Sequence, residues 1–178
     1  SCCSLLFLSC QKKIYNNVEN GFIDISDWSF QRDGEIGLKG NWKFKWLEDN
    51  SRFINSDYNY ENWDIIKVSG HWNYKVQNAF GYCWLRCKIK NNQNERLGLY
   101  LFNANSSYKL YINNELKMQN GEPGNNRKTT IPQAIPQYIQ IPNTEYLYIS
   151  WKISNFHDCN GGPRFTPIIN TISQIKYK

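Results

Sequence analysis

The sequence lacks the short motifs that mark the common enzyme classes. Its 178 residues contain no glycine-rich phosphate loop, no Gly-x-Ser-x-Gly turn, no His-Glu-x-x-His pair and no Cys-x-x-Cys pair. No Asp-x-Asp-x-Asp run is present to bind calcium, and consecutive residues such as His157, Asp158 and Cys159 rarely point at one metal ion. We therefore expect no enzymatic activity, no metal site and no cofactor.

Clusters of basic residues and long apolar runs are also missing. The 21 Lys and Arg residues outnumber the 15 Asp and Glu residues, which gives a net charge of +6, but they are dispersed. This dispersal argues against a nucleic-acid partner. Beyond residue 10 no apolar stretch approaches the ~20 residues of a membrane-spanning helix. No window of eleven or more residues shows a helical period, so helix is expected only in short turns, such as the region of residues 50–62.

The cysteines exclude a complete disulfide framework in the body of the chain. Beyond residue 10 there are three, Cys83, Cys87 and Cys159, so at least one thiol is free unless another chain supplies a partner. Cys83 and Cys87 lie four residues apart in a predicted strand, which separates them by about 13 Å. That distance is too long for a disulfide bond, and we interpret both as small core residues.

Aromatic residues, by contrast, are abundant at 16% and recur in strand-like alternation. Trp42, Phe44 and Trp46 alternate with two lysines, which places three rings on one face of a strand. The same alternation occurs in residues 82–90, 97–101, 108–112 and 147–153. Asn113 and Asn114 suit a tight hairpin turn, after which Leu116 and Met118 begin a return strand. The pattern predicts one all-β domain, a sandwich or a barrel of about eight or nine strands.

Three clusters in a fixed order resemble a known domain. They are Leu38-Lys-Gly-Asn-Trp-Lys-Phe44, then Trp63 followed by Val68-Ser-Gly-His-Trp72, then Phe80-Gly-Tyr-Cys-Trp-Leu-Arg86. We expect the glycines within them, Gly40, Gly70 and Gly81, to occupy turns that need a positive φ angle. The order of the clusters is similar to that of the galactose-binding-like jelly-roll domain. That domain precedes the barrel in family 2 glycoside hydrolases. It is also the amino-terminal ectodomain of bacterial seven-transmembrane sensors of the diverse-intracellular-signalling type and of related lipoproteins and cyclases.

Two further segments extend the resemblance over about residues 21–172. Residues 108–116 match the tyrosine-containing hairpin of such domains, with Asn114 in the place of the usual glycine. The segment Asn155-Phe-His157, followed by Gly161 and Gly162, looks most like the sensor ectodomains. The resemblance implies a galactose-binding-like jelly-roll β-sandwich over residues 20–178. It also implies a non-catalytic chain, because the catalytic carboxylates of the hydrolases lie on the separate barrel.

The amino end resembles an export signal. An apolar run ends at Phe7-Leu-Ser-Cys10, which is similar to a bacterial lipobox except that Phe7 stands where leucine is usual. We expect residues 1–10 to be a signal and lipobox remnant, Cys10 to be the lipidation site, and residues 11–19 to be a tether. The chain would then be anchored to a membrane in the periplasm or on the cell surface. A cloning or gene-start remnant is the alternative.

Two groups of residues are candidates for ligand binding. Trp72, Trp84 and Arg86 could form part of a concave face on which a ring meets a sugar and a guanidinium holds hydroxyls or a carboxylate. Each also has a structural interpretation, as a core aromatic or a buried cation.

The second group lies on a predicted loop and comprises Asn155, His157 and Arg164. Its polar side chains could bind sugar hydroxyls or an anionic group, but they could equally cap the neighbouring backbone.

The function that the resemblance implies is an extracytoplasmic sensory module that binds a small polar ligand, carbohydrate being the leading class. The module would belong to a bacterial membrane-associated signalling protein. Two alternatives remain open at this point. The chain could be an accessory sugar-binding domain of a family 2 glycoside hydrolase, or a lipoprotein with a structural or protein-interaction role.

Overall fold

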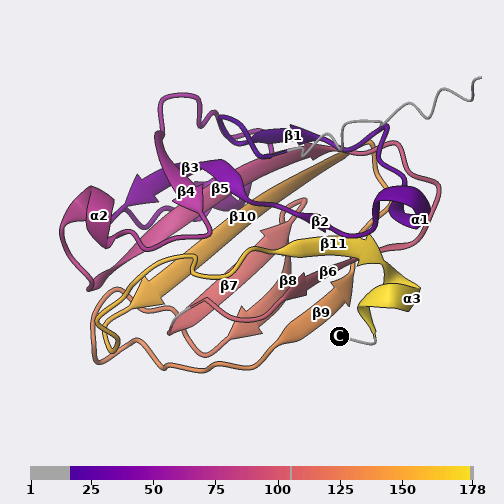
Figure 1. The fold of residues 1–178 in the computed structure, drawn as a ribbon. Helices are drawn as coiled ribbons and strands as arrows, with labels where there is room; N and C mark the ends of the chain where they lie inside the picture. Colours follow the sequence, from indigo (N-terminus) through magenta and orange to yellow (C-terminus); the bar gives the residue numbers. More distant parts are fainter. Residues whose placement is uncertain (1–16, 105, 177–178) are drawn as a thin grey trace, which may run out of the picture.

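The computed structural model describes residues 17–104 and 106–176, and two β-sheets dominate this part of the chain (Figure 1). The strands are β1 (Phe22–Asp24), β2 (Ile36–Gly37), β3 (Gly40–Trp46), β4 (Asp64–Val68), β5 (Gly81–Lys90), β6 (Leu97–Leu101), β7 (Ser107–Ile112), β8 (Glu115–Asn120), β9 (Gln137–Gln140), β10 (Tyr146–Asn155) and β11 (Ile168–Thr171). The helices are short, namely α1 (Phe30–Asp33), the 3₁₀ turn η1 (Ser51–Ile54), α2 (Asn73–Val76) and α3 (Ile172–Ile175).

The strands form a seven-stranded and a four-stranded sheet. The larger sheet has the order β4-β3-β5-β10-β7-β8, and β1 joins it by pairing in parallel with β5. Its longest contact is the antiparallel pair β5 and β10, which runs from Gly81 opposite Asn155 to Lys90 opposite Tyr146. The smaller sheet has the order β2-β11-β6-β9 and lies against the larger one (Figure 1). The predicted all-β sandwich is therefore confirmed.

The core between the sheets is built from the alternating positions that the sequence indicated. Trp42, Leu85 and Trp151 each have 0% of their surface exposed, and Tyr108 is equally buried. The ring of Trp151 makes edge-to-face contacts with Trp42 and Tyr108, both at 6.1 Å between centroids. Such pairs stabilise the fold beyond simple burial of area by about 1 kcal/mol each.

The predicted turn between the two central asparagines is confirmed. Asn113 and Asn114 both have positive φ angles, 48° and 74°, and connect β7 to β8. This is the left-handed backbone that a two-residue hairpin needs, and asparagine tolerates it well.

Two expectations need correction, and one strand departs from strict alternation. The described residues form eleven strands rather than eight or nine, because β1 and β2 have only three and two residues and are too short to show alternation. Leu116 is 48% exposed, since a shift in register between Leu110 and Tyr111 breaks the alternation on β8. Gly70 was predicted to need a positive φ angle and does not have one.

The folded body also begins earlier than predicted. Val18, which the sequence placed in the tether, is 1% exposed and exchanges backbone hydrogen bonds with Lys39 and Asn41. A side chain at Gly40 would collide with the Val18 carbonyl, so glycine permits this close approach. The predicted lipidation site Cys10 and the rest of the signal segment lie outside the described residues. None of the described helices has the length and hydrophobicity that a membrane crossing requires.

Candidate functional site

The first candidate group lies largely beneath a segment that covers the outer face of the seven-stranded sheet. We call residues 51–63, which include η1, the covering segment. Phe53 and Trp63 of this segment pack with Trp84 into a second, smaller hydrophobic cluster, with centroid distances from Phe53 of 4.7 Å to Trp63 and 6.0 Å to Trp84. As a result Trp84 is only 2% exposed. The expectation that Trp84 contributes to an open binding face is wrong for the folded chain.

Arg86 fastens the covering segment to the sheet. Its guanidinium donates hydrogen bonds to the carbonyls of Phe53 at 2.6 Å and Asn55 at 3.0 Å, and to the hydroxyl of Ser150. It also lies over the ring of Tyr60, 4.8 Å from the centroid. Burial lowers the pKa of Arg86 below its usual value, because the charged form loses hydration. No carboxylate of the described residues forms an ion pair with it, so neutral groups alone satisfy this cation.

Trp72 and the paired glycines are packed against each other. Trp72 is fully buried, its backbone N–H donates to the Gly161 carbonyl at 2.9 Å, and its indole N–H donates to the Ala79 carbonyl at 3.1 Å. A Cβ atom at Gly161 would overlap the indole ring, and one at Gly162 would lie 2.8 Å from the backbone nitrogen of Trp72. The glycines therefore make room for a tryptophan of the fold rather than for a ligand.

Asn155 ends β10 and uses its amide on the neighbouring backbone. The side-chain N–H groups donate to the carbonyls of Ala79 at 2.9 Å and Asp158 at 2.8 Å. The side-chain oxygen accepts from the backbone N–H groups of His157 at 3.3 Å and Asp158 at 3.0 Å. Asn155 is 0% exposed, so its capping interpretation agrees with the structure.

His157 and Arg164 are the members of the second group that reach solvent. A ring nitrogen of His157 lies 3.1 Å from the Thr130 carbonyl, and the guanidinium carbon of Arg164 lies 5.6 Å from the centroid of Phe165. Of the six candidates, Trp72 and Asn155 both donate to the Ala79 carbonyl. Trp84 and Arg86 lie elsewhere, beneath the covering segment on the outer face of the larger sheet. Ligand contact by His157 or Arg164 stays a prediction.

The three thiols of the body are unpaired. Cys83 and Cys87 are buried in the core as predicted, whereas Cys159 is exposed. Burial raises the pKa of both core thiols far above the usual value, because the thiolate would lose its hydration. Among the residues that the structure describes, no group of three His, Cys, Asp or Glu side chains is placed to hold a metal ion.

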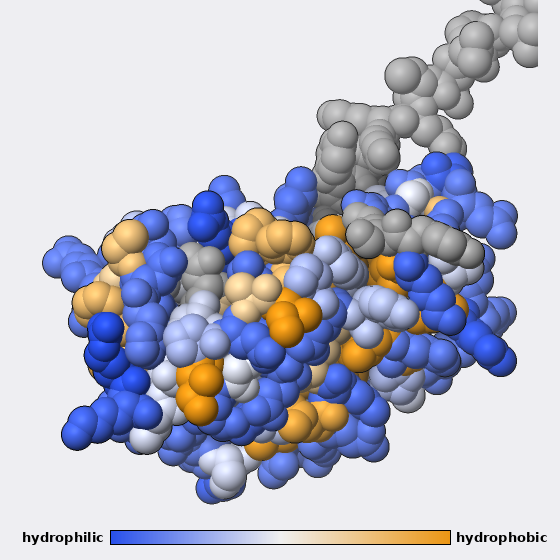
Figure 2. All heavy atoms as spheres, turned by 90° about the horizontal axis from the view of Figure 1, so that it is seen from below, coloured by the Kyte–Doolittle hydropathy of each residue, from blue (hydrophilic) through white to orange (hydrophobic). Residues whose placement is uncertain are grey.

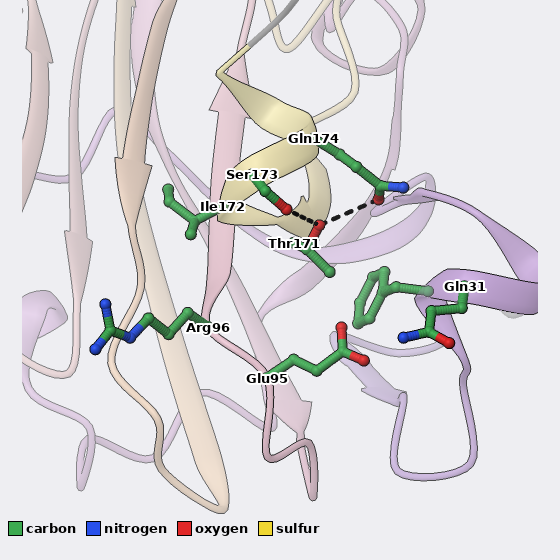
Figure 3. A pocket seen from close by; sticks show the side chains of 8 residues that line it. Gln31, Glu95, Arg96, Thr171, Ile172, Ser173 and Gln174 are labelled. Carbon is green, nitrogen blue, oxygen red and sulfur yellow. Dashed lines mark hydrogen bonds between the residues drawn. The ribbon is translucent and has the colours of Figure 1, made fainter.

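A pocket that sequence reasoning missed lies beside α3, where β11 ends and β6 begins (Figure 3). Its volume is about 410 Å³, and it is lined by residues of three separate segments, namely Phe30, Gln31, Glu95, Arg96, Thr171, Ile172, Ser173 and Gln174. The hydroxyl of Thr171 lies 3.1 Å from the Ser173 hydroxyl and 3.2 Å from the Gln174 amide oxygen. Figure 3 shows the Glu95 side chain directed toward Gln31 and the Arg96 side chain directed away from both.

The lining of this pocket has the chemistry of a site for a small polar molecule. Amides, hydroxyls, one carboxylate and one guanidinium supply donors and acceptors, and Phe30 and Ile172 supply apolar surface. Only the combination of distant segments creates the pocket, so no single sequence motif predicts it.

Comparison with solved structures identifies the architecture. A beta-glucuronidase from glycoside hydrolase family 2 matches with a TM-score of 0.61 and 15% identity over 76% of this chain. Bacteroides uniformis beta-glucuronidase matches with 0.60 and 14%, and a beta-glycosidase from Bacteroides vulgatus with 0.60 and 12%, each over 76% of this chain. The fold is an all-β jelly-roll sandwich like that of the matched part of these enzymes, in agreement with the fold that the sequence motifs predicted.

The similarity to these enzymes extends to the fold alone. The match takes up only 17% to 20% of the length of the three enzymes. At such low identity it establishes the fold and not the activity. No protein-family model matches the sequence, and no curated protein matches it either.

Proposed function

We propose that this chain is a non-catalytic carbohydrate-binding module that acts as the extracytoplasmic sensory part of a bacterial membrane-associated signalling protein. The observation that carries the binding function is the pocket beside α3, in which polar side chains from three segments surround apolar surface. Saccharides present hydroxyl groups at their edges and C–H groups on their faces, and this lining can satisfy both. The galactose-binding-like fold supports the same ligand class by analogy.

The composition of the pocket argues for binding rather than hydrolysis. Glycoside hydrolysis uses a pair of carboxylates placed on either side of the scissile bond. Glu95 is the one carboxylate in the lining of this pocket. It can accept hydrogen bonds from sugar hydroxyls, but it has no second carboxylate there to act with.

The sensory context rests on the sequence resemblance. The Asn155-Phe-His157 segment with its glycine pair is similar to that of sensor ectodomains, and Phe7-Leu-Ser-Cys10 is similar to a lipobox. In the structure Asn155 and the glycine pair shape one rim of the sandwich, so in this proposal the motif marks the domain type rather than the ligand site. Lipidation of Cys10 would place the module at a membrane surface, outside the cytoplasm.

An accessory domain of a glycoside hydrolase is the second candidate, and the structural matches favour it. A coding sequence that continues beyond Lys178 into a β/α barrel would support this candidate, whereas one that continues into membrane-spanning helices would support the sensor.

A pure protein-interaction role finds less support on the surface around β9. Figure 2 shows apolar side chains there scattered among polar ones rather than gathered into one large patch.

Binding can be measured by isothermal titration calorimetry of the full chain against neutral mono- and oligosaccharides. We expect Glu95→Gln and Gln174→Ala each to raise the dissociation constant at least tenfold, because both side chains line the pocket. Lys117→Ala is the matched control, since this lysine pairs with Glu115 on β8, which does not contribute to the pocket. Absence of binding to every saccharide, or equal losses in all three variants, would contradict the proposal.

A further inference from the structure

The outward-facing side chains of the larger sheet form a surface in which basic and aromatic residues alternate. Strand pairing places Phe22, Lys88 and Tyr148 in one row, and Asp24, Lys90 and Tyr146 in the next. Lys43 and Arg86 form a neighbouring row across β3 and β5. We call Phe22, Lys88, Tyr146 and Tyr148 the basic–aromatic patch.

Lys88 is the partly accessible cation of this patch, and aromatic rings surround it. Its ammonium lies 4.1 Å from the centroid of Tyr146 and 5.4 Å from that of Tyr148. Phe22, its neighbour across the parallel pair, is 41% exposed. The rings orient the ammonium by cation–π contact and leave aromatic edges and faces available beside it.

The cations on this surface divide into two classes. Five have a carboxylate partner, in the pairs Lys45–Glu48, Lys90–Asp24, Lys109–Glu122, Lys117–Glu115 and Lys152–Asp49. Lys43, Arg86 and Lys88 on β3 and β5, and Lys67 on β4, form no ion pair with any carboxylate of the described residues. Lys43 is 6% exposed and donates to the Glu61 carbonyl at 2.7 Å, and Arg86 is 1% exposed.

Two buried charges without counter-charges affect the surface above them. Backbone carbonyls accept hydrogen bonds from Lys43 and Arg86 but do not cancel their net charge. In a protein interior such charges are screened less than in water, so they raise the positive potential at the nearby ammonium of Lys88. The patch therefore attracts anions more strongly than a single surface lysine would.

We propose that the basic–aromatic patch is a second binding site, separate from the pocket beside α3, and that it takes an anionic saccharide. The Lys88 ammonium holds the carboxylate or sulfate group, and the rings of Tyr146, Tyr148 and Phe22 pack against the sugar. The choice of a saccharide rests on the proposed function, whereas the assignment of an anion rests on the unpaired cations. A single-stranded nucleic acid uses the same two kinds of side chain, but it needs a groove of cations along a backbone, and this patch is short and bounded by ion pairs.

The test compares two lysines of one strand that differ in their partners. The full chain is titrated at low ionic strength with a polyuronate, a sulfated glycan, a neutral glycan and an oligothymidylate. We expect the wild type to bind the polyuronate or the sulfated glycan, and Lys88→Met to weaken that binding at least tenfold. Lys90→Met, which removes a cation already paired with Asp24, is expected to weaken it less than threefold. Tyr146→Ala, which removes the ring nearest Lys88, should weaken it about fivefold.

Several results would overturn the inference. Equal losses in the two lysine variants would indicate attraction by net charge alone, and tighter binding of the oligothymidylate would indicate the wrong ligand class. If the wild type binds neutral glycans but neither anionic one, the second site is wrong and the proposed function remains. If it binds no glycan of any kind, both fail. Circular dichroism and the melting temperature of each variant confirm that the fold is intact.

Discussion

The side chains of Trp72 and Asn155 donate hydrogen bonds to the same acceptor, the backbone carbonyl of Ala79. The two residues are 83 positions apart (155 − 72) and belong to α2's cap and the end of β10. Through these two hydrogen bonds, the Ala79 carbonyl connects the loop before β5 to the loop after β10. These residues, which the sequence suggested as ligand contacts, thus hold the rim of the sandwich together.

The first prediction compares the contributions of Asn155 and its exposed neighbour His157 to the stability of the fold. Asn155→Ala removes two donated and two accepted hydrogen bonds in a buried setting, so we expect a loss of about 2–3 kcal/mol in the free energy of unfolding. This corresponds to a fall of about 5–10 °C in the melting temperature. His157→Ala, on an exposed side chain, should change the free energy by less than about 0.5 kcal/mol. Urea denaturation measures both, and similar losses would show that Asn155 is not the structural residue of the pair.

A second prediction concerns the contact between Gly161 and Trp72. Gly161→Ala forces a methyl group into the indole ring and should destabilise the fold by about 2–3 kcal/mol. Trp72→Phe removes the indole atoms of this contact at its own cost, although the Ala79 carbonyl oxygen still lies 2.5 Å from the position of the new methyl group. In the double variant the loss should therefore be smaller than the sum of the two single losses by at least about 1 kcal/mol. Strict additivity in chemical denaturation would count against the steric explanation.

Alternation along single strands was enough to predict the core. Trp42, Leu85 and Trp151 are buried because inward and outward positions alternate along β3, β5 and β10, and this signal lies within each segment. The turn at Asn113 and Asn114 was predictable for the same reason, since two adjacent residues carry its geometry.

The candidate site was not predictable in this way, because it depends on contacts between distant segments. The covering segment has no periodic pattern, yet Phe53 and Trp63 bury Trp84, so a residue on the outer face of the sheet became part of a second cluster. The pocket combines Gln31, Glu95 and Gln174, which no spacing in the sequence links. The patch around Lys88 likewise depends on which lysines find carboxylates, and strand pairing decides this.

A third prediction tests the role of Arg86 as the anchor of the covering segment. Arg86→Met leaves the Phe53 carbonyl without its donor and removes one of two donors from the Asn55 carbonyl, which keeps its bond from the Tyr58 N–H. The segment should therefore detach more readily from the sheet. We expect a loss of about 2 kcal/mol in stability and faster amide hydrogen exchange confined to residues 51–63. Arg164→Met, on an exposed arginine, is the matched control and should leave exchange there unchanged. Exchange that rises evenly over the whole chain would contradict a local anchoring role.

A fourth prediction concerns the two core thiols. In the unfolded chain they ionise near pH 8.5, whereas burial raises the pKa of Cys83 and Cys87 in the folded chain well above that value. The unfolded state therefore loses protons first as the pH rises. The stability that the protonated thiols contribute is fully present below about pH 8 and declines above it. Each thiol should contribute a loss of about 1.4 kcal/mol in the free energy of unfolding per pH unit above its unfolded pKa.

Urea denaturation of the reduced protein between pH 8 and pH 10 measures this slope. The double variant Cys83→Ala with Cys87→Ala lowers stability near pH 8, where the thiols are protonated, because it leaves small cavities, but its slope between pH 8 and pH 10 should be flatter by about 2 kcal/mol per pH unit. An unchanged slope would mean that the thiols already ionise in the folded chain.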